Sequence, residues 1–217
     1  MSTARLLGGG AAAAIALALA PAAPARAAGA LAYTVSVQGL GAFAVFSDEP
    51  EQGPVPGTVY HETAVSAGAL GAREGGPGQA SPYLVVDQVA YSYDLEGSYQ
   101  RISESVGAAF GSAVTYDADR RLSQASASGA LPLRTCDTSG TCLDEGTITV
   151  DVQWTGYGPV LRSRGTDVHR GDGGTVFVGR GSDALRAASA ASSLPGSLVE
   201  GLVDYSSFSE KCIGSGC

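Results

Sequence analysis

The chain has 217 residues, which is the length of one domain with a substantial hydrophobic core. It carries 21 acidic and 13 basic residues, a formal net charge of −8. Because nucleic acids and anionic membranes are bound through basic surface, this balance argues against both as partners. It suits a soluble extracellular protein, with or without a cationic ligand.

Residues 1–27 have the pattern of a bacterial secretory signal peptide. Arg5 precedes an alanine-rich apolar run over 11–20, two prolines end that run, and the sequence A-R-A at 25–27 is a small-x-small cleavage site. The apolar run is too short to span a bilayer, and no later segment resembles a transmembrane run. We therefore expect residues 1–27 to be removed and residues 28–217 to be one secreted domain without integral membrane association.

After the leader, strand patterns alternate with segments rich in glycine, proline and aspartate. The acidic, proline-rich segment 48–57 predicts a loop. The segment 67–82 is so rich in glycine that it predicts a second, mobile loop. Gly39 and Gly41 allow a bend between the first two strands. The strands expected in this half of the chain are 33–38, 42–46, 58–65 and 83–95.

The segment 99–110 is ambiguous between helix and strand. Its apolar residues fit helical spacing when Tyr99 is included, and they fit strand alternation when Ala108 is included. The all-β character of the flanking segments favours a strand.

The clearest strand is Thr147–Thr155. Its even positions are Ile, Val, Val and Trp, and its odd positions are polar, so one face is apolar and the other faces water. This alternation is typical of antiparallel sheets. Trp154, on the apolar face, is predicted to be a core anchor rather than a platform for a sugar. The whole pattern predicts an all-β domain, a single antiparallel sandwich or flattened barrel of about seven to nine strands.

The four cysteines indicate disulfides, since an exported chain meets an oxidising environment. Cys136 and Cys142 flank a turn-forming segment and are too far apart for a usual zinc knuckle. Cys212 and Cys217 lie close together near the C-terminus. We expect two local bridges, Cys136–Cys142 and Cys212–Cys217, so that the second closes the tail; the two crossed pairings are the alternatives.

No catalytic, cofactor or metal motif is present, so we expect no catalytic residue, no cofactor and no metal ligand. His61 begins an H-E-x-x pattern that lacks the second histidine of a zinc protease. We expect it to be a neutral, hydrogen-bonded core or barrel-lining residue, and His169 to be a surface residue. Asp87 falls on the apolar face of strand 83–95, where a buried carboxylate would have a raised pKa. A bulge or bend that turns Asp87 outward is the simpler interpretation. The acidic loops lack the spacing of a calcium-binding motif, so we expect their carboxylates to be ordinary solvent-exposed groups.

Two stretches, WTGYGPVLRSRGTDVHR (154–170) and FVGRGSDALRAASA (177–190), resemble a pattern of small, uncharacterised exported proteins of actinobacterial type. The resemblance implies export and a β fold, and it implies no activity. We therefore expect a non-catalytic extracellular binding module for an unidentified partner or ligand. The alternatives are a secreted hydrolase that uses Asp87 with His61 or His169, and a structural component of the cell envelope.

Overall fold

The computed structural model describes residues 32–74, 80–171 and 175–213. Within these ranges the chain forms one antiparallel sheet of ten strands. In chain order the elements are β1 (Ala32–Ser47), β2 (Val59–Glu74), β3 (Ser81–Tyr93), β4 (Tyr99–Phe110), the 3₁₀ turn η1 (Gly111–Ala113), β5 (Val114–Ala118), β6 (Gln124–Asp137), β7 (Cys142–Gly156), β8 (Leu161–Arg170), β9 (Val176–Ser192) and β10 (Ser197–Ile213). Across the described ranges, we find no helix with the length and apolarity needed to traverse a membrane.

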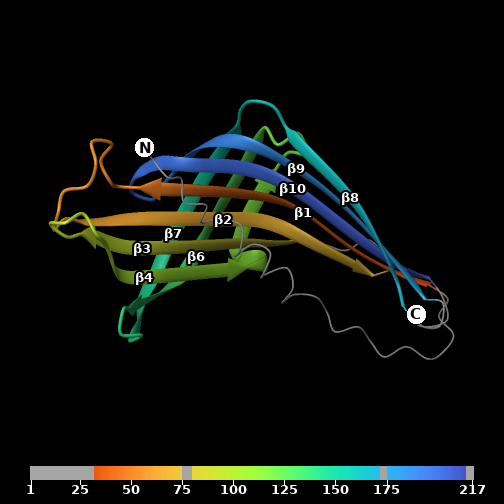
Figure 1. Ribbon diagram of the computed structural model, residues 1–217, viewed down its shortest axis with the longest axis horizontal. Helices are drawn as coiled ribbons and strands as arrows, with labels where there is room; N and C mark the ends of the chain where they lie inside the picture. Colours follow the sequence, from red (N-terminus) through yellow and green to blue (C-terminus); the bar gives the residue numbers. More distant parts are fainter. Residues whose placement is uncertain (1–31, 75–79, 172–174, 214–217) are drawn as a thin grey trace.

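The sheet closes on itself (Figure 1). Neighbouring strands follow the order β10–β1–β2–β3–β4–β6–β7–β9, and β9 pairs in turn with β10, so these strands form a ring. The predicted all-β antiparallel class is confirmed. Because the ring is a single hydrogen-bonded sheet, the fold is close to the barrel alternative, and it has ten strands where seven to nine were expected.

Two strands, β6 and β9, each pair with different neighbours along different parts of their length. The first part of β6 pairs with β5 and its last part with β4. The end of β9 (188–192) pairs with β7 and closes the ring, whereas its beginning (176–185) pairs with β8. Among the described residues β8 pairs only with β9, so it is an edge strand.

The long strands extend beyond the closed ring. β9 and β10 have 17 residues each and β1 has 16, whereas β4 has 12. Figure 1 shows β1, β8, β9 and β10 running together past the ends of β3 and β4. We call this extension the arm; it consists of residues 32–41, 161–170, 176–185 and 204–213, which pair with one another in regular register.

The core fills the ring and follows the alternation of the sequence. On β7, Val150, Val152 and Trp154 are almost completely buried, and the intervening residues are exposed. The Trp154 indole Nε1 donates a hydrogen bond to the Phe43 carbonyl oxygen at 2.9 Å and so ties β7 to β1 across the core. The prediction that Trp154 is a core anchor is therefore confirmed.

The predicted loop over 67–82 is wrong for most of its length. Strand β2 continues to Glu74 and β3 begins at Ser81; residues 75–79 lie outside the described ranges. Small residues are needed here because the strands pack closely: a Cβ at Gly68 would lie 2.8 Å from both the Leu40 carbonyl oxygen and the Tyr83 ring. Cross-strand hydrogen bonds offset the entropy cost of ordering these glycines. The ambiguous segment 99–110 is a strand, and β1 runs through Gly39 and Gly41 unbroken.

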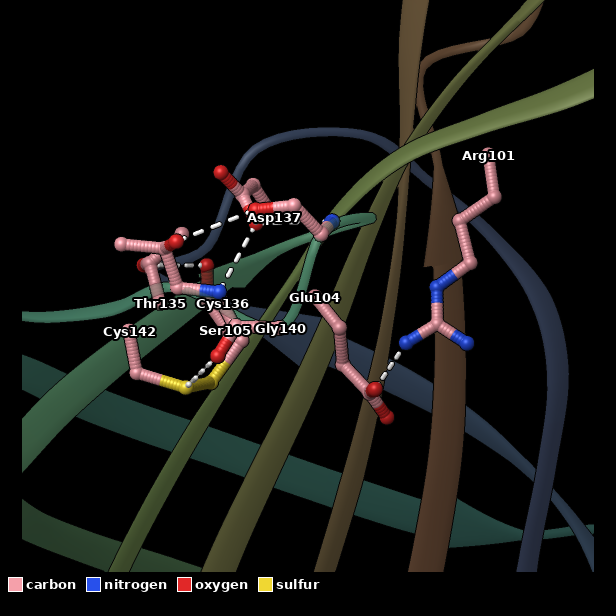
Figure 2. Close-up of a disulfide and its surroundings, with 10 residues drawn as sticks. Arg101, Glu104, Ser105, Thr135, Cys136, Asp137, Gly140 and Cys142 are labelled. Atoms are coloured by element: carbon pink, nitrogen blue, oxygen red, sulfur yellow. Dashed lines mark hydrogen bonds and ion pairs between the residues drawn. A yellow bond between two sulfur atoms is a disulfide. The ribbon is translucent and has the colours of Figure 1, made fainter.

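The β6–β7 hairpin carries the disulfide expected between Cys136 and Cys142 (Figure 2). The Asp137 carboxylate accepts hydrogen bonds from the backbone N–H groups of Ser139 and Thr141 and so shapes the turn between the two cysteines. Cys212 is buried and disulfide-bonded. Cys217, its predicted partner, lies outside the described residues.

Candidate functional site

A cavity of about 350 Å³ lies where the arm leaves the closed part of the barrel. Four of its lining residues, Ala69, Leu40, Tyr205 and Arg162, belong to one row across the sheet: Ala69 pairs with Leu40, Leu40 with Tyr205, Tyr205 with Ala184, and Ala184 with Arg162. Directly paired residues in an antiparallel sheet point to the same face. This face continues the barrel interior, since Ala184 belongs to the core, and we call it the inner face.

Arg120 lines the cavity from the turn between β5 and β6. The turn is held by its own hydrogen bonds: the Leu122 N–H donates to the Asp119 carbonyl, and the Ser123 N–H and hydroxyl donate to the Asp119 carboxylate. The Ser123 hydroxyl and N–H, which donate to the carboxylate, lower the pKa of Asp119. Leu122 has a positive φ of 57° and a buried side chain, so the core anchors the turn that presents Arg120.

The electrostatics of this cavity are basic, although the chain as a whole is acidic. Arg120 and Arg162 both line it, and neither forms an ion pair with any residue that the structure describes. Gln38 and Tyr205 add polar groups, and Leu40 and Ala69 add apolar surface. A guanidinium presents several N–H donors in a plane, which suits a carboxylate or phosphate. The cavity is therefore suited to a small anion with an apolar portion.

A second hollow of similar size is lined by residues that include Asp117, Asp119, Gln124, Gln153 and Trp154. It is less suited to binding a charged ligand, because the Asp119 carboxylate is already engaged in shaping the β5–β6 turn.

On the outer face of the sheet, a row of residues places Asp204 and Tyr83 on either side of two glycines. Asp204 pairs with Gly41, Gly41 with Gly68, and Gly68 with Tyr83. Burial, and secondly the negative charge of Asp183, raise the pKa of Asp204. Burial and the Asp204 charge raise the pKa of Tyr83 to about 12.

Four tyrosines cluster at the other end of the barrel, and they fix the β1–β2 loop. Tyr91 stacks on Tyr99 with ring centroids 5.2 Å apart, and Tyr60 and Tyr93 contact Tyr91. The Tyr91 hydroxyl donates to the Glu49 carboxylate at 2.8 Å, and the Val55 N–H donates to the Tyr60 hydroxyl oxygen. These contacts give the cluster a structural role.

The structure separates Asp87 from His61, one of the two pairs considered for a hydrolase. His61 and Ala64 lie on opposite faces of β2, and Asp87 pairs with Ala64, so Asp87 and His61 are on opposite faces of the sheet. His61 lies on the inner face of β2, as a barrel-lining residue would, but it is not in the core: its side chain is 43% exposed and lies 2.9 Å from the Asp48 carboxylate. His169 is exposed beside Asp167 on the arm, as predicted for a surface residue.

Asp87 lies on the outer face of the sheet, since its partner Ala64 is on the opposite face of β2 from Ala69, but no bulge places it there. The β2–β3 register is regular at this position, and the irregularity in the β3–β4 pairing falls later, between Ala90 and Tyr91. One carboxylate oxygen of Asp87 is buried without a hydrogen-bond partner, and burial raises the pKa of this group while the Arg101 charge opposes the rise. Arg101 itself forms an ion pair with Glu104 (Figure 2).

No group of three or more histidine, cysteine, aspartate or glutamate side chains in the described ranges is arranged to hold a metal ion. Sequence reasoning missed Arg120, Arg162 and Tyr205. The available signal was the alternation of arginines in L-R-S-R at 161–164, which places two guanidinium groups on one face of a strand in an otherwise acidic chain.

Comparison with known proteins gives little that bears on function. No protein-family pattern matches the chain, and no curated protein matches it. Among solved structures, the fold has a distant match to an acetoacetate decarboxylase-like enzyme from Sphingomonas wittichii RW1. The match covers 84% of this chain and 91% of that chain, with 8% sequence identity and a TM-score of 0.27. A similarity this distant carries no conclusion about activity.

Proposed function

We propose that the protein is an exported, non-catalytic binding protein that holds a small organic anion in the cavity between Arg120 and Arg162. The observation that carries this proposal is the pair of arginines, from separate elements, that line one cavity without ion-pair partners in the described chain. A preformed concave site with apolar walls and a few convergent polar groups is the usual form of a small-ligand site. The leader pattern at 1–27 supports export.

Calorimetry and thermal shift with the exported chain test this proposal. The probes are straight-chain monocarboxylates of increasing length, each beside the alcohol of equal length, together with inorganic phosphate. We expect a carboxylate to raise the melting temperature by roughly 5–10 °C at a hundredfold excess over its dissociation constant. The matching alcohol lacks the charge and is expected to have no effect.

Single substitutions locate the site. Arg120→Gln and Arg162→Gln should each abolish most of the shift, because each removes one guanidinium from the cavity. Arg121→Gln is the matched control: it makes the same change in net charge at the neighbouring exposed position, which does not line the cavity. Equal shifts with alcohols and carboxylates, or equal losses in the control, would contradict the proposal.

A further inference from the structure

The arm separates its charges by face. Its arginine and lysine side chains are Arg162, Arg164, Arg170, Arg180 and Lys211, and in the strand register all of them fall on the inner face. Its acidic side chains are Asp167, Asp183, Asp204 and Glu210, and all of them fall on the outer face. Side chains alternate strictly between faces along a strand, so this separation follows from the parity of the positions.

This separation leaves the basic side chains without neutralising neighbours. Arg164 pairs with Ser182 and Arg180 with Thr166, so the two arginines are diagonal neighbours on the same face. In the part of the chain that the structure describes, neither forms an ion pair. Like charges placed this close on one face repel each other, whereas opposite charges in these positions would stabilise the sheet. A bound polyanion would remove this repulsion.

Hydroxyl groups on this face can also donate to an anion, and aliphatic side chains such as Val168 and Val178 lie on the same face. Ser182, Ser207 and Ser209 lie between the basic side chains, and the Ser182 and Ser207 hydroxyl oxygens are 2.8 Å apart. Apart from Tyr205 in the cavity, no described aromatic residue on this face is available to stack on a nucleic-acid base. Proteins that bind single-stranded nucleic acids use such stacking platforms. Guanidinium and hydroxyl donors without aromatic platforms favour a charged polysaccharide.

The length of the face indicates an extended ligand. Arg162 and Arg170 are eight residues apart in the regular strand β8, a distance of roughly 27 Å at the usual rise per residue. A small anion in the cavity would contact only the row that contains Arg162. Every residue of β8 is exposed, so the part of the face formed by β8 is accessible along its whole length.

We propose that the inner face of the arm binds an extended acidic polysaccharide, one that carries a carboxylate on its repeating unit. The polymer lies along β8, β9 and β10, and the cavity at the base of the arm receives its end. This inference rests on the proposed function in one respect only, the role of the cavity. The charge separation on the arm is an independent observation.

The test uses the exported chain with polygalacturonate as the probe and neutral dextran as the control polymer. Wild-type protein should bind polygalacturonate with an affinity that falls steeply as salt is added, and it should not bind dextran. The double substitution Arg164→Gln/Arg180→Gln should weaken polygalacturonate binding roughly tenfold and flatten its salt dependence. It should leave small-carboxylate binding unchanged, because Arg120 and Arg162 remain in the cavity.

The matched control is Arg121→Gln/Arg134→Gln, which removes two exposed arginines outside the arm and should retain wild-type affinity. Equal weakening in the control would show a nonspecific charge effect and overturn the proposal. Tighter binding of a single-stranded oligonucleotide than of polygalacturonate at equal charge would also overturn it, in favour of nucleic acid. If Arg120→Gln loses small-carboxylate binding but still binds polygalacturonate, the result supports the inner face of the arm as the polymer site. If the wild-type protein binds small carboxylates but not polygalacturonate, the polysaccharide proposal fails and the cavity proposal stands.

Discussion

Among single side chains, Asp204 has an unusual environment, because its half-buried carboxylate lies against the backbone of a glycine, Gly41. A Cβ at Gly41 would lie 2.5 Å from an Asp204 carboxylate oxygen, so the glycine makes the room that the carboxylate occupies. Burial, and secondly the Asp183 charge, raise its pKa above the usual 3.8. The folded protein therefore holds this proton more tightly than the unfolded chain does. The resulting stabilisation is complete below pH 3.8 and is lost as the pH rises through the folded-state pKa.

Asp204→Asn should therefore stabilise the protein at neutral pH, where it removes a poorly solvated charge. We expect the melting temperature at pH 7 to rise by roughly 2–4 °C, the change that about 1 kcal/mol produces in a domain of this size. The gain should shrink as the pH approaches 4. Thermal unfolding from pH 4 to 8 measures both effects, and Asp144→Asn, at an exposed position, is the control. A gain that is the same at every pH would contradict this account.

Gly68 makes a second prediction about single residues. Because an added methyl group would collide with the Leu40 carbonyl oxygen and the Tyr83 ring, Gly68→Ala should destabilise the fold by about 1–3 kcal/mol. Gly165→Ala is the matched control, since nothing lies within 4 Å of its Cβ position. That substitution should be neutral or slightly stabilising, because it restricts the unfolded chain. Urea unfolding of both variants decides the comparison, and similar costs at the two positions would refute the packing argument.

For the secondary-structure elements, the contact between β7 and β1 is the one whose loss is simplest to measure. Trp154 is 1% exposed, and its indole donates to the Phe43 carbonyl oxygen. Its fluorescence should be blue-shifted in the native protein and move to longer wavelength on unfolding. Trp154→Phe should cost about 1–3 kcal/mol, because the Phe43 carbonyl is left without its donor. Native emission typical of exposed indole would contradict the core position.

For the whole molecule, export and disulfide bonding make a joint prediction. The secreted chain should begin at Ala28 or Gly29, because cleavage is expected after the A-R-A sequence or one residue later. It should contain no reactive thiol, because all four cysteines are expected to be paired. Intact mass and thiol titration of protein from the culture medium test both statements. A retained leader, or two titratable thiols, would show that the compartment or the pairing is wrong.

The net charge of the whole molecule gave no indication of the basic inner face of the arm. A balance of −8 argues against anionic partners only when charge is spread evenly. On the arm, strand alternation collects the bases on one face and the acids on the other. The basic face is therefore a local property that composition cannot reveal.

Alternation along Thr147–Thr155 was enough to predict the strand, its buried face and the position of Trp154, because side-chain direction in a strand has a period of two. The turn residues between Cys136 and Cys142 were enough to predict that bridge. The segment 67–82 was misread, because its glycines are ordered by close contacts with β1 and β3 rather than by local preference. For the same reason, the separation of Asp87 from His61 was visible only once the register was known.

Local chemistry thus determined the expected leader, the all-β class, the strand faces and the turn at the Cys136–Cys142 bridge, since each depends on residues close together in the chain. The closure of the ring, the cavity and the basic face of the arm depend on which strands pair and in what register. Arg120 and Arg162 are 42 positions apart in the sequence and share a cavity only because the turn between β5 and β6 lies beside residues of β1, β2, β8 and β10. Register is set by the packing of the whole sheet, so only the tertiary structure decided where these charges gather.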